Sequence, residues 1–146
     1  MFAEQYGIVS VNETELTGLV DALSEEQLSR FVSAAAHSRP LEYFSWTGKE
    51  TTVANLVEYL VVHVLRNCGF GNGEARFANG VWTVTMRAHG HGFVQWAKAY
   101  IPAVFREYHG IAPNIVTMNN TIQFTVADAG HGKTKGPAST EIVATQ

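Results

Sequence analysis

The chain has 146 residues, of which 46% are hydrophobic and 16% charged, with a formal net charge of -3. This length predicts one domain with a buried core, and the absence of a Lys/Arg cluster argues against direct nucleic-acid binding. No apolar run reaches the roughly 18 residues of a transmembrane helix, and the single cysteine, Cys68, excludes an internal disulfide. We therefore expect a cytoplasmic protein without a signal peptide or a membrane partner.

Two short helices are predicted near the N-terminus, over residues 12–38. Ser24 and Gln27 have the spacing of a capping box, which marks the start of the second helix. Four apolar residues then recur at helical spacing: Leu28, Phe31, Val32 and Ala35. Pro40 is expected to end this helix, because proline cannot donate a backbone hydrogen bond. Glu42–Trp46 alternates aromatic and polar residues, which favours a short strand.

The middle of the chain predicts a helix followed by a β-hairpin. Thr47-Gly48-Lys49-Glu50 has capping-box spacing, and an apolar stripe continues from it to about Asn67, where two nearby glycines end the helix. Glu74–Ala78 and Val81–Arg87 then alternate in polarity. They are joined by Asn79-Gly80, the strongest short signal for a hairpin turn.

A second helix and further strands complete the predicted core. The helix covers about Phe93–His109, and Pro102 is expected to bend it. Ile115–Val126 predicts two strands or one long strand, with a turn or bulge at Asn119-Asn120. Small and polar residues dominate afterwards, so 128–146 is expected to be a flexible tail.

From residue 42 the element order is β-α-β-β-α-β, which predicts an α+β domain of the ferredoxin-like type. The domain would span 1–127, with helices at 12–38 and the βαββαβ core at 42–127. Its core helices would cover one face of an antiparallel sheet. The other face then needs cover from the N-terminal helices or from a second subunit, and we expect a homodimer.

Two histidines before the second core helix are candidates for metal binding. His89 and His91 are two residues apart, and such residues share a face in a strand. His63 and Cys68 could complete the site if the preceding helix ended nearby. Zinc motifs bring four ligands at characteristic spacings, which this sequence lacks. The alternative is a turn in which His89 makes a structural hydrogen bond and His91 is solvated.

Aromatic side chains cluster on the predicted strands and helices, and aromatic pockets suit small apolar ligands. Such a pocket is expected between the 93–109 helix and the sheet, lined by Trp82, Trp96 and Tyr100, with His89 as a fourth candidate. Tyr and Trp each bring a hydrogen-bond donor that a ligand could engage. The alternative is that these rings only fill the core.

Residues 127–134 match a loose form of the phosphate-binding loop and end in Gly132-Lys133-Thr134. Phosphate binding by such a loop needs a strand before it and a helix after it. The residues that follow include Gly136 and Pro137 and do not predict a helix, so we do not expect nucleotide binding.

The motif His89-x-x-Gly92-x-x-x-Trp96 resembles one in small uncharacterised archaeal α+β domains, where it lies between a strand and a helix. Further similar segments are Gly48-Lys49, Cys68–Gly71, Ala97–Phe105 and Asn120–Phe124. The resemblance covers about residues 12–127. Such domains often accompany predicted ribbon-helix-helix regulators, so it implies the effector or oligomerisation part of a regulator. Residues 1–11 are too short to supply a DNA-binding segment of that kind.

A looser resemblance is to hydrocarbon-binding and haem-NO-binding-like sensor domains, in which aromatic helices lie over a small sheet. A haem would need a helical histidine facing a pocket, which only His63 provides approximately. We therefore expect a non-enzymatic domain for ligand sensing, oligomerisation or protein interaction in archaeal regulation, with a small apolar or aromatic molecule as candidate ligand. The alternative is a metal-binding protein or metal-dependent enzyme using His89 and His91. The sequence identifies no cofactor.

Overall fold

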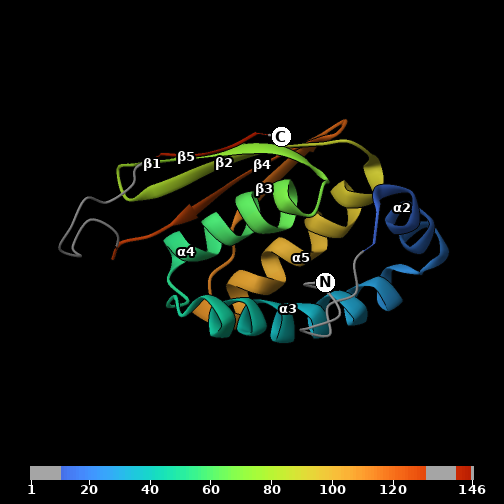
Figure 1. Ribbon diagram of the computed structural model, residues 1–146, viewed down its shortest axis with the longest axis horizontal. Coiled ribbons are helices and arrows are strands. Elements are labelled where there is room, and N and C mark those ends of the chain that lie inside the picture. The colour runs from blue at the N-terminus through green and yellow to red at the C-terminus, as the bar shows by residue number, and fades with distance from the viewer. Residues whose placement is uncertain (1–10, 131–140, 146) are drawn as a thin grey trace.

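The computed structural model describes residues 11–130 and 141–145, which form a layered α+β structure (Figure 1). In chain order the elements are α2 (Glu13–Ala22), α3 (Glu25–Thr47), α4 (Val53–Glu58), η1 (Tyr59–Asn67), β1 (Gly71–Ala78), β2 (Val81–Ala88), α5 (His91–His109), β3 (Asn114–Met118), β4 (Thr121–Ala127) and β5 (Glu141–Ala144). The predicted α+β class is confirmed. No helix in the described parts of the chain is long and apolar enough to cross a membrane.

The five strands form one antiparallel sheet in the order β3-β4-β2-β1-β5. The hairpin of β1 and β2 turns at Asn79 and Gly80, as predicted, and both residues have positive φ, 54° and 76°. In the centre, Val84 on β2 lies opposite Ala75 on β1 and Phe124 on β4, and all three are buried. The ferredoxin-like arrangement is not confirmed, because the strand order and the number of helices differ from it.

Helix α3 continues through Pro40 to Thr47, so the predicted helix end and the predicted strand at Glu42–Trp46 are wrong. Proline removes one backbone donor, but Pro40 and Phe44 are both buried one turn apart and hold this half of the helix in the core. Gly48 then ends the helix with φ 72°, a left-handed conformation that favours glycine. The aromatic residues of this segment therefore follow a helical face instead of a strand.

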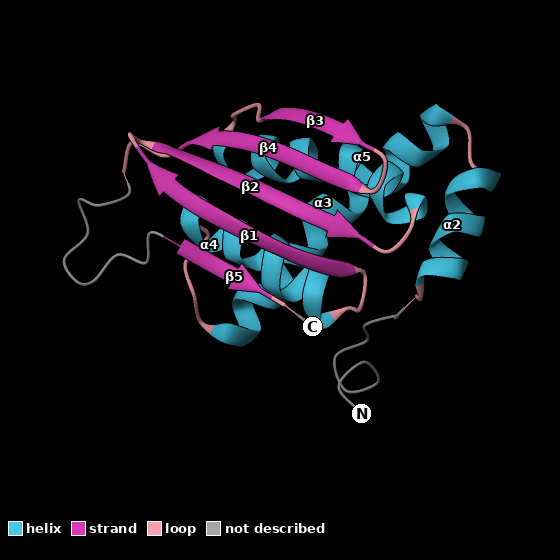
Figure 2. Ribbon diagram, turned by 90° about the horizontal axis from the view of Figure 1, so that it is seen from above, coloured by secondary structure: helices cyan, strands magenta, loops and turns pink. Residues whose placement is uncertain are grey.

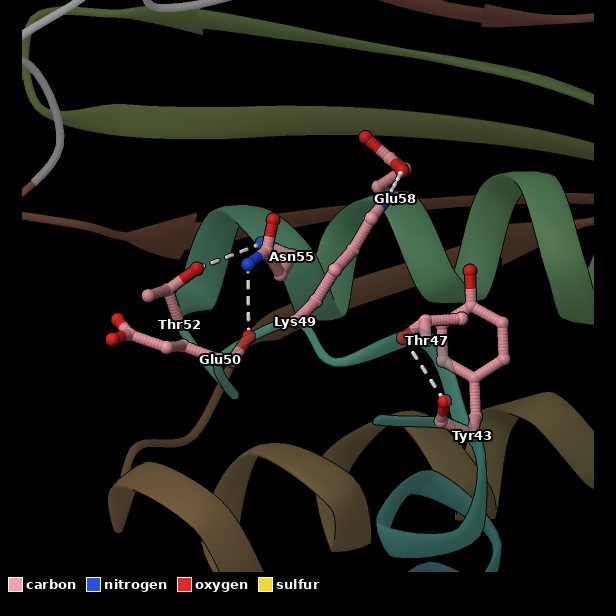
Figure 3. Close-up of polar contacts among 7 residues, drawn as sticks. All are labelled: Tyr43, Thr47, Lys49, Glu50, Thr52, Asn55 and Glu58. Carbon is pink, nitrogen blue, oxygen red and sulfur yellow. Dashed lines mark hydrogen bonds and ion pairs between the residues drawn. The ribbon is translucent and has the colours of Figure 1, made fainter. Parts of the chain in front are cut away.

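The start of α4 is fixed by side chains on the preceding loop (Figure 3). The hydroxyl of Thr52 accepts the amide of Asn55 at 3.1 Å, and the Asn55 side chain donates to the Glu50 carbonyl at 2.8 Å. The helix thus begins at Val53, and its cap, Thr52, lies five residues after the predicted cap at Thr47. Thr47 instead ends α3.

Two further contacts in the same view tie this loop to its neighbours (Figure 3). Thr47 donates its hydroxyl proton to the Tyr43 carbonyl at 3.0 Å. Lys49 donates from Nζ to a Glu58 carboxylate oxygen at 2.6 Å, and this hydrogen bond raises the pKa of Lys49. The first contact closes the last turn of α3, and the second anchors the loop to α4.

After Glu58 the predicted single helix changes into the nine-residue π-helix η1. Its end shows the wider spacing, because the amides of Cys68 and Phe70 donate to carbonyls five residues back, at 3.2 and 2.8 Å. Gly73 on β1 lets η1 lie close to the sheet. A Cβ at this glycine would lie only 2.9 Å from the Leu65 side chain.

All the helices lie on one side of the sheet. Helices α4, η1 and α5 lie next to the strands, α3 packs beneath α5, and α2 lies at the end of α5 (Figure 1). Seen from the other side, the sheet carries no described element on its outer face (Figure 2). The N-terminal helices therefore do not supply the cover for this face that the sequence analysis allowed.

The predicted flexible tail over 128–146 is wrong for Glu141–Ala144, which form β5 beside β1. Ala144 lies opposite Gly73 and is fully buried. A four-residue segment without long apolar periodicity can pair in this way because β1 supplies an open edge for its backbone. Residues 1–10 and 131–140, including Lys133 and Thr134, lie outside the described residues.

We expect a chain truncated after Gly130 to lose stability, because it removes the backbone pairing and the buried side chain of β5. Loss of such a strand is expected to lower the free energy of unfolding by about 1–3 kcal/mol. Urea unfolding of both chains measures the difference. The Ala144→Asp variant should reproduce part of the loss, and a truncated chain of full stability would contradict the role of β5.

Candidate functional site

The two candidate metal histidines lie in the turn between β2 and α5. The strand ends at Ala88 and the helix begins at His91, so the assumption that both histidines share one strand face is wrong. The backbone amide of His89 donates to the Phe70 carbonyl at 2.8 Å. The His91 ring nitrogen Nε2 lies 3.4 Å from the carboxylate of Asp21 on α2. Each histidine is thus engaged with a different part of the fold.

Glu13 on α2 caps the N-terminus of α5. The helix has Gly90 at its N-cap position, which brings no side chain for capping. The Glu13 carboxylate oxygen Oε1 instead accepts the amides of Gly92 at 3.1 Å and Phe93 at 3.4 Å, and the Thr17 hydroxyl at 3.0 Å. A negative charge here also opposes the positive end of the helix dipole. One carboxylate therefore joins α2 to α5.

The glycines of the His-Gly-His-Gly sequence are required by this contact. A Cβ at Gly92 would lie 2.6 Å from the backbone N and Cα of Thr17, which are not free to move away. A Cβ at Gly90 would collide with the Glu13 side chain. Close helix packing therefore accounts for the most distinctive motif of the sequence.

We expect the Gly92→Ala variant to unfold more easily than the parent chain, because α2 must shift. Overpacking of this kind costs about 1–3 kcal/mol. Glu13→Ala should lose the cap, at about 1 kcal/mol. Thermal or urea unfolding measures both, with the exposed Glu15→Ala on the same helix as matched control. Equal stability of Glu13→Ala and Glu15→Ala would contradict the capping role.

The alternative metal residues, His63 and Cys68, belong to the end of η1. The His63 ring packs on Tyr43 and Tyr59, with ring centroids 4.6 and 5.7 Å apart, and burial lowers its pKa. Cys68 is exposed, yet the surrounding protein raises the pKa of its thiol and disfavours the thiolate that binds metals. Across the described residues, no three His, Cys, Asp or Glu side chains gather as a metal site would require.

The three aromatic candidates for a ligand pocket take part in two separate ring contacts. Trp96 stacks on Tyr100 within α5, with ring centroids 4.1 Å apart and an interplanar angle of 20°. Trp82 on β2 instead packs against Phe77 at 5.3 Å and donates from its indole nitrogen to Asp128 at 3.1 Å. Trp82 and Tyr100 are fully buried, and Trp96 is nearly so. The structure thus places all three rings in the core, with only Trp96 and Tyr100 in a shared stack.

Sequence analysis missed the partner of Tyr100. The hydroxyl of Tyr59, on η1, lies 2.8 Å from the hydroxyl of Tyr100, and both are buried. Desolvation raises the pKa of each phenol, and the guanidinium of Arg39 opposes this in part. The pair joins η1 to α5 through a polar contact inside an apolar layer. The ring of Tyr43 packs next to this pair, with its centroid 5.0 Å from that of the Tyr59 ring.

We expect Tyr59→Phe and Tyr100→Phe each to lower the free energy of unfolding by about 1–2 kcal/mol, because each leaves a buried hydroxyl without its partner. The double variant should cost less than the sum of the two. A double-mutant cycle from urea unfolding measures the coupling, and additive losses would contradict the bond.

The same pair should make the protein sensitive to alkali. Its raised pKa values in the folded state mean that the unfolded chain loses these protons first, so the stabilisation is complete below about pH 10 and decreases above it. Unfolding between neutral pH and pH 11 should therefore show a steeper loss in the parent chain than in the Tyr59→Phe/Tyr100→Phe variant. Parallel pH profiles would contradict this assignment.

The outer face of the sheet is left uncovered by the described elements (Figure 2). The strand registers place on it Asn72, Glu74, Arg76, Ala78, Val81, Thr83, Thr85, Arg87, Asn114, Val116, Met118, Thr121, Gln123, Thr125, Ala127, Glu141 and Val143. Its centre is rich in threonine. Glu74 pairs with Arg87 at 3.3 Å and Arg76 with Glu141 at 3.7 Å, so its charges are balanced.

The most exposed large apolar side chains of this face lie at its two edges. On β3, Val116 and Met118 are 66% and 72% exposed, and on β5 Val143 is 57% exposed. The β3 side also has a hollow of about 260 Å³ lined by Val116, Met118, Asn119, Thr121 and Gln123. Exposed valine and methionine beside a hollow favour a contact surface over a solvated face.

Comparisons with known proteins give no family for this chain: no family model matches it, and neither the curated proteins nor the solved structures contain a match. The site is therefore argued from its own geometry. Three of its features were not predicted from the sequence: the Glu13 cap, the Tyr59 hydroxyl and the exposed β3 side chains. Only the alternation of β3 signalled one of them, since it puts Val116 and Met118 on the same face.

Proposed function

We propose that this chain is a non-enzymatic interaction domain that associates with a second copy of itself through its uncovered sheet. The observation that carries the proposal is the one-sided arrangement of the helices, which leaves the outer face of the sheet bare in the described residues. Antiparallel sheets often have one solvated face. On this one, the exposed side chains of Val116 and Met118 lie beside a hollow, which favours a contact surface.

The charges of the outer face favour this partner over a nucleic acid. Two arginines and two glutamates occur there as ion pairs, and lysine is absent from the face as the strand registers define it. A nucleic-acid surface would need an excess of positive charge. A neutral face, by contrast, meets a copy of itself without repulsion.

Three of the described histidines are engaged in contacts with neighbouring elements of the fold. His37 lies 2.7 Å from Glu107, and His109 lies 2.6 Å from the Thr51 carbonyl. His63 is stacked on aromatic rings. These contacts support a non-enzymatic role over a metal-dependent enzyme. A place in archaeal regulation rests on the sequence resemblance.

A second candidate function is small-ligand sensing at the Tyr59–Tyr100 pair. Two hydroxyl groups carry two protons, and the bond between them uses one. We infer that this remaining proton would be the donor for a small acceptor, next to the Tyr100 ring on which Trp96 stacks. Tryptophan fluorescence titrated with small aromatic and apolar molecules tests this function, since a bound ligand would shift the emission of Trp96 but not that of a Trp96→Phe control.

We expect the purified protein to be a dimer at micromolar concentrations. Its mass from light scattering should be twice the chain mass of 16.0 kDa, and dilution should return it toward 16.0 kDa. Reversibility is expected because the exposed apolar area is modest. A mass of one chain at every concentration up to the solubility limit would overturn the proposed function.

A further inference from the structure

We propose that the dimer forms by edge-to-edge pairing of β3 with β3 of the second copy, antiparallel and centred on Val116, which joins two five-stranded sheets into one. This inference rests on the proposed function and specifies the surface that carries it. It selects one edge of the sheet over the other and fixes the register of the contact.

Among the described residues, nothing covers β3 at the edge of the sheet. It pairs with β4 on one side only and stands last in the strand order. Its five residues, Asn114–Met118, include no charged side chain and no proline. Free backbone donors and acceptors on such an edge add a further strand unless charge, proline or a covering element prevents it.

The opposite edge of the sheet, β5, differs from β3 because it carries charged side chains. Strand β5 begins with Glu141, which lies 3.7 Å from Arg76 on β1, so a charged pair occupies that border. Charged side chains on an edge oppose strand addition. Val143 there is nevertheless exposed, to an extent close to that of Val116, which makes it a matched control.

The sequence of β3 suits pairing with itself. About a two-fold axis at the centre of the strand, Val116 lies opposite Val116 of the partner subunit, and Asn114 lies opposite Met118 of the partner subunit. Both pairs are on the outer face, where Val116 and Met118 are exposed. On the inner face, Ile115 meets Thr117 of the partner subunit. No like charges meet in this register, and the branched valine pair is favourable across strands.

The hollow beside β3 adds side-chain contact to the backbone pairing. Val116 and Met118 line it together with Asn119, Thr121 and Gln123, on the same outer face. Methionine is flexible enough to fill irregular gaps. In this register Asn114 of the partner subunit faces Met118 at the hollow, and the Met118 side chain can adjust to it. A partner with a charged strand would find no opposite charge on β3.

Disulfide trapping tests the register. In a Cys68→Ser background, Val116→Cys places two thiols opposite each other across the two-fold axis, where Cα atoms of facing residues lie about 4.5–5.5 Å apart and can form a disulfide. Mild oxidation should give a covalent dimer of this variant and leave the Val143→Cys control monomeric on a non-reducing gel. A covalent dimer from Val143→Cys and none from Val116→Cys would overturn the proposal.

Charge substitution provides the second measurement. Val116→Lys places two like charges opposite each other and should weaken dimerisation at least about tenfold, while Val143→Lys should leave it unchanged. Melting temperatures check that both variants fold; if Val116→Lys fails to fold, the trapping result decides. A parent chain that dimerises while neither Val116 substitution has its effect overturns edge pairing but leaves the proposed function. A parent chain that is monomeric throughout overturns both.

Discussion

Burial of most of α5 is the constraint on which the rest of the structure depends. The helix lies between the sheet and α3, and ten of its residues are buried, including Phe93, Tyr100 and Phe105. Its N-terminus lies against α2, so the free backbone amides there need an acceptor from the protein. Glu13 provides that acceptor, and Gly92 provides the space for it. The Tyr59–Tyr100 bond then attaches η1 to the same helix.

This arrangement uses every described helix on one side of the sheet. α3 packs against α5 and, through Tyr43, against η1, and α2 packs against the end of α5, so neither can also cover the outer face (Figure 1). That face keeps alternating threonines and balanced ion pairs, which suit water, together with Val116 and Met118 at the β3 edge, which do not. A neutral, uncapped edge strand beside an apolar hollow is a structural reason for self-association that a fully solvated sheet would lack.

Local signals in the sequence predicted local structure well. The Ser24–Gln27 capping box is present with both hydrogen bonds, at 2.9 and 3.1 Å, and the hairpin turns at Asn79-Gly80. The prediction that Pro40 ends the helix was wrong, because burial of the following turn outweighs one missing backbone hydrogen bond. The prediction of a flexible tail was wrong for β5, because this strand is stabilised by the edge of β1, which lies far away in the sequence. In the candidate site, the Trp96–Tyr100 stack follows from helical spacing, whereas Tyr59 lies 41 residues from Tyr100 and Glu13 lies 79 residues from Gly92. No periodicity predicts contacts of that kind.

In the proposed dimer, β3 is the edge strand at which the two copies associate. Amide hydrogen exchange followed by mass spectrometry, at dilute and at concentrated protein, tests it most directly, because an added strand protects the backbone amides that it pairs with. The account predicts that peptides covering Asn114–Met118 exchange more slowly at high concentration, while those covering Glu141–Ala144 exchange at the same rate in both. Equal exchange of β3 at both concentrations, or protection that appears at β5 instead, would contradict it.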